Sequence, residues 1–383
     1  MTKPTISLCT FTYNDHRLVN GLLAGLAEWS VQPDEVLVMD DGSDPPYDPQ
    51  GLPGNARVLR NGQNQGITAA KHRTISQAKA DLVVAMDCDA RVGPDWLALT
   101  LSHLARPEVG AVSGPVFHDA GQDLVSRFLA CRGDNHHLGS SGPVDFLPGN
   151  ALVFKRRVWE DIEGFSGYDR EVCEDHVFSL RARRAGYVLW VEPLAKVAQV
   201  RKLSRTAAVM RFWKWYHDAY KKRLVLEEAM PLLAFELLVK PLSERVGPSL
   251  EAGEPLFIYL ELLYMFHAIL DLLRFGQKKW AHTALAQQAL LAEFAGFFSE
   301  YPRLMHLLRA DLGRMGHAWP KTTLAGPRMW EAIFSVLECL KPTGIFTWLA
   351  EAGVRKLLAD DAALDRDFSF YLASSLDEPG LRA

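Results

Sequence analysis

The first half of this sequence predicts an open, mostly parallel α/β sheet, and the second half predicts a helical region. Up to about residue 196, short runs of apolar and β-branched residues alternate with segments of helical spacing. Acidic residues directly follow two of the apolar runs. From about residue 206 the strand pattern stops, and only long segments with helical periodicity follow.

The individual strands and helices of the first half follow from local patterns. Apolar runs rich in Val, Ile and Leu indicate buried strands, and apolar residues three or four positions apart indicate helices. The predicted strands are residues 6–12, 35–39, 56–59, 82–86, 109–112 and 151–154. The predicted helices are residues 18–29, 68–80, 96–104 and 174–184, the last closed by Gly186.

The second half contains segments of helical pattern separated by proline and glycine. The predicted helices are residues 206–223, 231–239, 255–275, 280–299, 328–340 and 347–358. We therefore expect an α/β domain over residues 1–205 and an all-helical domain over residues 206–383. The most apolar stretch carries Glu261, His267 and Asp271, which favours a buried amphipathic helix over a membrane span.

Composition narrows the classes of partner. The net charge of −4 provides no global attraction for nucleic acid, so we expect none as a partner. Five widely spaced cysteines indicate free thiols of a cytosolic protein rather than a disulfide framework. The first residues lack the layout of a signal peptide, and we expect a cytoplasmic protein.

Three acidic loops fall at or near the ends of predicted strands. They are Asp40-Asp41-Gly42-Ser43, Asp87-Cys88-Asp89 and Glu174-Asp175. Each loop alone also fits an ordinary turn or a helix cap. Ligands of open α/β sheets bind beyond the carboxyl ends of the strands, so the three loops together predict a binding site at one edge.

The chemistry of these carboxylates suits a phosphate-bearing substrate. Asp87 and Asp89 repel each other unless a cation lies between them, and Mg²⁺ or Mn²⁺ takes oxygen ligands that it shares with phosphates. Such an ion would neutralise a diphosphate leaving group. Asp175 lies in the first turn of its helix, where the helix dipole favours a carboxylate that can accept a hydroxyl proton.

Seven motifs occur in a fixed order along the first 200 residues. They are Thr12-Tyr13-Asn14, Asp40-Asp41-Gly42-Ser43, Asn64-x-Gly66, Asp87-Cys88-Asp89, Gly149-Asn150, Gly164-Phe165 and Glu174-Asp175. In order and interval they resemble family 2 of the inverting glycosyltransferases, over about residues 5 to 200. The resemblance implies a GT-A type sandwich that binds a nucleotide-sugar, with UDP as the expected nucleotide, and transfers its sugar to an acceptor hydroxyl.

The resemblance also implies residue roles. The nucleotide-sugar site would consist of Thr12, Tyr13, Asn14, Asp40, Asp41, Lys71 and Asp87. Within it, Asp41 would bind the base and Lys71 would face the diphosphate. Asp89 would ligate Mg²⁺ or Mn²⁺ together with Asp87, and Asp175 would be the catalytic base.

The sequence departs from the family pattern at two positions. Many relatives carry a metal-binding His after the last strand, where this chain reads Ala198-Gln199-Val200-Arg201. His72 stands where the family usually has Asn. Either metal binding would then be weaker, or Arg201 and Lys202 would serve the diphosphate in part instead.

Two alternatives and several partners stay open. A nucleotidyltransferase would show a glycine-rich basic loop after the first strand. Residues 11–15 contain neither glycine nor a basic residue, which argues against this alternative. An inactive relative would act as a scaffold.

The acceptor would be a glycan, a lipid-linked molecule or a protein. The basic aromatic residues 211–223 fit either the inner membrane surface or packing on the catalytic domain, and the apolar stripe of residues 257–269 fits either core or a homodimer.

Overall fold

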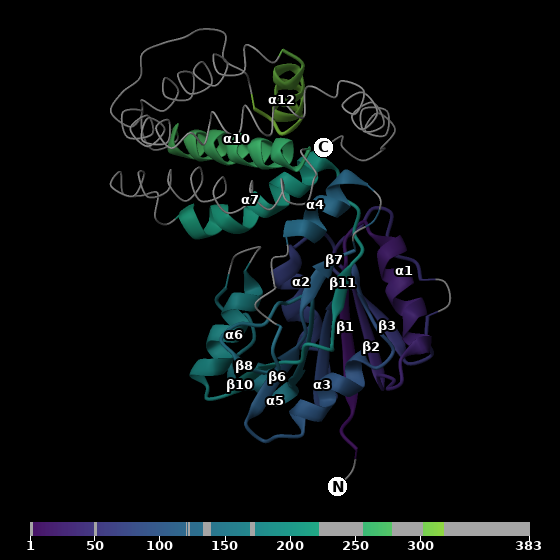
Figure 1. Ribbon diagram of the computed structural model, residues 1–383. Helices are drawn as coiled ribbons and strands as arrows, with labels where there is room; N and C mark the ends of the chain where they lie inside the picture. Colours follow the sequence, from purple (N-terminus) through teal and green to yellow (C-terminus); the bar gives the residue numbers. More distant parts are fainter. Residues whose placement is uncertain are drawn as a thin grey trace. The chain divides into compact units, whose positions relative to one another are not determined.

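The computed structural model describes residues 3–49, 52–119, 121, 123–132, 139–168, 173–221, 256–277 and 302–317. The chain forms two compact units (Figure 1). The first consists of Met1–Ala120 and Gly133–Arg201, and the second of Gly121–Arg132 and Lys202–Ala383. The sequence pattern does not predict that residues 121–132 group with the C-terminal unit.

The first unit is built on an eight-stranded sheet. In spatial order its strands are β3 (Ala56–Arg60), β2 (Glu35–Asp40), β1 (Ile6–Thr12), β4 (Leu82–Asp87), β9 (Ala151–Lys155), β6 (Val109–Ser113), β10 (Val188–Val191) and β8 (Gly142–Val144). β3, β2, β1 and β4 run parallel, while β9 and β8 run antiparallel to their neighbours. The predicted mostly parallel α/β sheet is confirmed.

A second, three-stranded sheet was not predicted. Its strands are β5 (Ala90–Val92), β11 (Val197–Gln199) and β7 (Val116–His118). Three residues are too few to show a strand periodicity. The sheet matters for the site because β11 pairs with β5, which places Gln199 opposite Ala90.

Helices cover both faces of the main sheet. They are α1 (His16–Gly25), the 3₁₀ turn η1 (Leu26–Glu28), α2 (Ile67–Ile75), α3 (Trp96–Leu104), α5 (Arg156–Asp161) and α6 (Glu174–Arg184). Alternate residues of β1 enter two cores: Ile6 packs with apolar residues of α1 and α3, and Cys9 packs with those of α2, α5 and α6. The predicted helices 18–29 and 68–80 extend beyond the ends of α1 at Gly25 and α2 at Ile75. The helix α5 was not predicted.

The elements that the structure describes in the second unit are all helices. Its helices are α4 (Leu124–Arg132), α7 (Arg205–Lys221), α10 (Leu256–Gln277) and α12 (Pro302–Arg314). α7 and α10 confirm the predicted helices 206–223 and 255–275, whereas α4 and α12 were missed. Pro302 opens α12, a position where its missing N–H costs no helical hydrogen bond. The helices predicted over residues 231–239, 280–299, 328–340 and 347–358 lie outside the described residues.

The apolar stripe of α10 is core within one chain. Phe257, Leu260 and Leu263 are buried, and Trp213 of α7 meets Tyr264 edge to face. The Trp213 indole donates a hydrogen bond to Asp271 at 2.6 Å, so this aromatic residue packs on α10. Among the helices that the structure describes, none is long and apolar enough to cross a membrane.

A buried ion pair also lies inside the second unit. Arg205 at the start of α7 donates to both carboxylate oxygens of Asp311 on α12, with an Nη2–Oδ1 distance of 2.9 Å. The Tyr259 hydroxyl donates to the same carboxylate at 2.6 Å. Asp311 is inaccessible to solvent and Arg205 is 6% exposed, so the pair is satisfied internally.

Candidate active site

The parallel strands bring the predicted site residues to one edge of the main sheet. In the strand register Thr12 lies opposite Asp40, and Phe11 lies opposite Asp87. The strands β1, β2 and β4 therefore end together, and their loops leave the sheet side by side. This is the position at which open α/β sheets bind ligands.

Asp40, the last residue of β2, is fully buried. Its carboxylate accepts hydrogen bonds from the backbone N–H groups of Ser43 at 2.9 Å and Tyr47 at 3.0 Å, and it pairs with Arg60. Burial alone would raise the pKa of Asp40, but these partners bring it below its usual value. Asp40 thus stabilises the loop that follows β2 through its contacts with Ser43 and Tyr47. Its part in nucleotide binding stays a prediction.

Asp41 joins this loop to the segment before α2. Its carboxylate accepts hydrogen bonds from the Asn61 amide at 2.6 Å and from the backbone N–H groups of Gln65 at 3.0 Å and Gly66 at 2.9 Å. Gly42 has φ +78°, and a Cβ there would lie 2.4 Å from the facing backbone. The Asp-Asp-Gly sequence therefore fixes two loops against each other.

A cavity of about 350 Å³ lies beside this pair of loops. It is lined by Asn61, Gly62, Gln63, Gln65, Ala69 and Arg73. Two of these, Asn61 and Gln65, are also the hydrogen-bond partners of Asp41. Asp41 itself is buried and does not line this cavity, and its expected contact with the base stays a prediction.

The loop after β1 connects the ends of two strands. Asn14 donates its backbone N–H to the Ser43 hydroxyl at 2.9 Å and accepts the backbone N–H of Asp44 at 2.9 Å. Thr12 is buried, whereas Tyr13 is 46% exposed. Of these three predicted nucleotide-binding residues, Tyr13 therefore has a side chain open to a ligand, and Asn14 orders the neighbouring loop.

Lys71 on α2 is a buried cation between two carboxylates. Its Nζ lies 3.0 Å from Asp87 and 2.8 Å from Glu174, and it donates to the Gly149 carbonyl at 3.2 Å. Burial alone would lower the pKa of Lys71, but the two carboxylates raise it well above its usual value. Lys71 joins the end of β4 to the start of α6, and its expected contact with a diphosphate stays a prediction.

Asp175 lies at the start of α6, beside Gly149. Its carboxylate accepts the Gly149 backbone N–H at 3.2 Å, and a Cβ added at Gly149 would lie 3.0 Å from the Asp175 Cβ. Burial, and then the neighbouring Glu174 charge, raise the pKa of Asp175. A carboxylate with a raised pKa is a stronger base, which suits a group that takes a hydroxyl proton.

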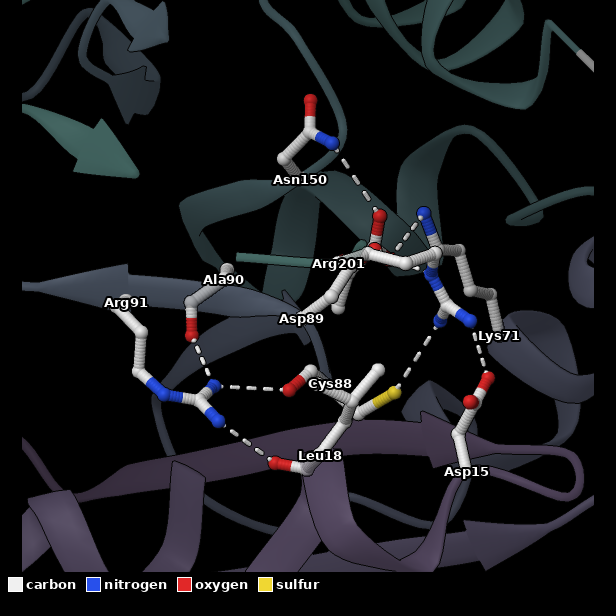
Figure 2. A network of polar contacts seen from close by, with 10 residues as sticks. Asp15, Leu18, Lys71, Cys88, Asp89, Ala90, Arg91, Asn150 and Arg201 are labelled. Atoms are coloured by element: carbon white, nitrogen blue, oxygen red, sulfur yellow. Dashed lines mark hydrogen bonds and ion pairs between the residues drawn. The ribbon is translucent and has the colours of Figure 1, made fainter. Parts of the chain in front are cut away.

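Asp89 forms an ion pair with Arg201, the residue that follows β11 by two positions (Figure 2). Arg201 donates from Nε to Asp89 at 2.8 Å, from Nη1 to Asp15, and from Nη2 to the Cys88 sulfur at 3.8 Å. The Val200 N–H donates to the Asp89 carbonyl at 2.9 Å, which fixes the approach. Arg201 belongs to the segment 198–201, in which the family resemblance led us to look for a metal-binding His.

The acidic residues here fit a divalent cation that a substrate helps to hold. Burial raises the pKa of Asp87 to about 6 in spite of Lys71, and Asp89 and Glu174 add to the shift, so negative charge is in excess. The described part of the chain contains no group of three or more His, Cys, Asp or Glu residues that could hold a metal. Mg²⁺ sites of this kind use one or two carboxylates and complete their coordination with water and substrate phosphates. Asp87 and Asp89 fit that role.

The predicted residues are therefore connected. Lys71 contacts Asp87 and the Gly149 carbonyl, and the Gly149 N–H donates to Asp175. Asn14 contacts Ser43 and Asp44 of the loop after β2. The next residue, Asp15, shares the Arg201 guanidinium with Asp89. Sequence reasoning left out Asp15, the Arg201 partner, and the side chain of Asn150, whose amide lies 3.5 Å from Asp87. Asp15 directly follows the Thr12-Tyr13-Asn14 motif, and Asn150 belongs to the Gly149-Asn150 motif, so their positions in or beside the motifs were the available signal.

The fold is a GT-A-like α/β sheet with mostly parallel strands, the class of fold found in glycosyltransferases. Residues 7–177 match the family described as Glycosyl transferase family 2. The resemblance drawn from the motifs is confirmed.

Similarity to individual proteins is distant. An N-acetylglucosaminyltransferase of Sinorhizobium fredii is 23% identical over 270 residues, covering 65% of each chain. A glucosyl-dolichyl phosphate glucuronosyltransferase of Haloferax volcanii is 22% identical over 189 residues, covering 46% of this chain and 59% of the relative. The chain spans about 65% of the length of the first of these relatives.

The chain also shows distant similarity to solved structures. The mannosyltransferase PcManGT from Pyrobaculum calidifontis, in complex with GDP-Man and Mn²⁺, is 20% identical with a TM-score of 0.43, covering 82% of this chain and 86% of its own. S. aureus TarS in complex with UDP-GlcNAc is 15% identical with a TM-score of 0.42, covering 82% and 93%.

Proposed function

We propose that this protein transfers a sugar from a UDP-sugar to an acceptor hydroxyl with inversion at the anomeric carbon. The observation that carries the proposal is the Lys71 contact, which joins Asp87 at the donor edge to Glu174 beside Asp175. A donor-binding edge and a base thereby belong to one site. The match of residues 7–177 to the family described as Glycosyl transferase family 2 supports the same reaction.

In the proposed reaction Asp175 takes the proton of the acceptor hydroxyl as its oxygen attacks the anomeric carbon. The bond from that carbon to the diphosphate oxygen breaks, and its electron pair leaves with the nucleotide diphosphate. The Gly149 N–H, 3.2 Å from the Asp175 carboxylate, orients the base. Mg²⁺ or Mn²⁺, held by Asp87 and Asp89, would neutralise charge on the leaving diphosphate when bound.

The remaining expectations belong to the same proposal. The nucleotide would lie along Thr12, Tyr13 and Asp41, with its base near the cavity by Gln65. The acceptor would be a glycan, a lipid-linked molecule or a protein in the cytoplasm or at the inner face of the membrane. The helical unit would serve acceptor binding or homodimer formation.

The test is a screen of UDP-sugars for donor hydrolysis and transfer, beginning with UDP-N-acetylglucosamine because one relative is an N-acetylglucosaminyltransferase. With an active donor, we expect Asp175→Asn to lower kcat by about 100- to 10,000-fold while UDP binding is retained. Asp95→Asn is the control, because Asp95 is exposed before α3 and makes no side-chain cap hydrogen bond.

Unchanged transfer by Asp175→Asn would contradict the base assignment. Absence of UDP binding in a calorimetric titration with Mn²⁺ would contradict the donor assignment and favour an inactive scaffold. Release of pyrophosphate from a nucleoside triphosphate would instead indicate a nucleotidyltransferase.

A further inference from the structure

Arg201 occupies the carboxylate that the family pattern assigns to a metal ion. Its Nε donates to Asp89 at 2.8 Å, and the Asp89 side chain is 3% exposed. Two backbone contacts fix this position: Gln199 pairs with Ala90, and the Val200 N–H donates to the Asp89 carbonyl. The ion pair is therefore built into the pairing of β11 with β5 and is not a chance surface contact.

The guanidinium is held without being enclosed. An arginine has five N–H donors, and the contacts with Asp89, Asp15 and Cys88 use three of them. The Arg201 side chain is 27% exposed. A planar guanidinium with donors to spare suits a phosphate group, so Arg201 can exchange a carboxylate for a phosphate oxygen.

Charge around the edge explains why such an exchange is needed. Four carboxylates, those of Asp15, Asp87, Asp89 and Glu174, face two cations, Lys71 and Arg201. A diphosphate alone would add negative charge to this excess, and a metal ion alone would compete with Arg201 for Asp89. When a metal ion and a diphosphate bind together, the ion offsets the negative charge of the diphosphate. The diphosphate in turn supplies ligands for the ion and hydrogen-bond acceptors for Arg201, so that Arg201 can release Asp89.

We propose that Arg201 competes with the divalent cation for Asp89, so that the cation enters the site only together with a nucleotide diphosphate. Arg201 is a positioning residue in this scheme. It holds Asp89 in the donor-free protein and turns toward the phosphates when the pair arrives. The inference rests on the proposed function for the identity of the diphosphate, but the competition itself is a property of Arg201 and Asp89.

The experiment measures Mn²⁺ binding to the full chain by electron paramagnetic resonance, with and without UDP. We expect weak binding of Mn²⁺ alone to the wild-type protein and much tighter binding with UDP. Arg201→Met keeps the length of the side chain and removes its charge, and we expect it to bind Mn²⁺ alone about 10- to 100-fold more tightly than wild type. Arg201→Lys restores a cation and should stay close to wild type.

Arg91→Met is the matched control. Arg91 lies two residues from Asp89, and its guanidinium donates to the carbonyls of Cys88, Ala90 and Leu18 (Figure 2). Arg91 makes no hydrogen bond to the Asp89 carboxylate, so its loss should change the Mn²⁺ affinity far less than the loss of Arg201. Thermal unfolding of each variant identifies any that fail to fold. If Arg201→Met does not fold, the dependence of Mn²⁺ affinity on UDP in the wild-type protein still tests the proposal.

Three results would overturn the inference. They are equal Mn²⁺ affinity of wild type and Arg201→Met, tight Mn²⁺ binding by the wild type without UDP, and UDP affinity that is the same with and without Mn²⁺. The last would assign diphosphate neutralisation to Arg201 alone. Failure of UDP to bind any variant, with the Mn²⁺ difference intact, would instead count against the proposed donor and leave the competition standing.

Discussion

Two arginines four positions apart in the sequence have opposite surroundings. Arg205 pairs with one inaccessible carboxylate, Asp311, and is itself 6% exposed. Arg201 pairs with two carboxylates, Asp89 and Asp15, and its side chain is 27% exposed. Burial alone would lower the pKa of each guanidinium, and in both cases the carboxylates raise it instead.

The difference separates a structural ion pair from a site. The Asp311 carboxylate accepts from Arg205, Tyr259 and Arg314, so its lone pairs are filled by the chain itself. Arg201 keeps donors and accessible surface, and carboxylates around it outnumber cations. A buried ion pair whose hydrogen-bonding groups are all satisfied by the chain is a structural contact. A partly exposed ion pair with excess negative charge around it is a candidate ligand-binding site.

Breaking the enclosed pair should give the largest effect. Asp311→Asn leaves the buried Arg205 guanidinium without a counter-charge, and we expect a loss of about 3–5 kcal/mol in unfolding free energy. Urea unfolding followed by circular dichroism measures it. Arg314→Gln is the control, since this partner of Asp311 is 41% exposed and its loss should cost about 1 kcal/mol or less. Similar values for both variants would remove the distinction between the pairs.

Breaking the open pair should matter less for folding. Arg201→Met should lower the unfolding free energy by about 1–2 kcal/mol, because water reaches Arg201 and Asp15 and replaces part of what is lost. The same urea titration measures the change. A loss as large as that of Asp311→Asn would mean that Arg201 is primarily a structural residue.

A further effect should appear as a dependence of stability on pH. The folded pKa of Asp87 is about 6, above its ordinary value of 3.8, so the folded protein binds more protons than the unfolded chain between these values. Ionisation of Asp87 should therefore reduce stability as the pH rises from about 4 through about 6. Asp87→Asn lacks this group, so its stability relative to wild type should increase over that window. Parallel curves of urea midpoint against pH for the two proteins would contradict the expectation.

The donor edge was predictable because its information is local. The runs that form β1, β2 and β4 are visible as apolar segments, and parallel pairing necessarily brings Thr12, Asp40 and Asp87 to one edge. The ends of α1 and α2 were misplaced because helical spacing continues past Gly25 and Ile75, where the backbone turns instead.

The surroundings of Arg201 and Lys71 were not predictable in the same way. β11 has three residues, and the contact of Arg201 with Asp89 joins positions 112 residues apart. Lys71 lies on a helix whose pattern does not reveal that one of its carboxylate partners, Glu174, comes from 103 residues away. A single sequence gives residue types at such positions, and tertiary pairing decides which of them meet.

The tight contact at Gly149 has a consequence for protein engineering. A methyl group there would press on Asp175 and lie 3.4 Å from the Lys71 Nζ, so both the base and its electrostatic support would shift. Randomised libraries selected for turnover should return glycine at this position whatever sugar is offered. Position 149 should therefore be kept as glycine in such libraries. Tyr13, whose side chain is exposed to solvent, is a better position to randomise.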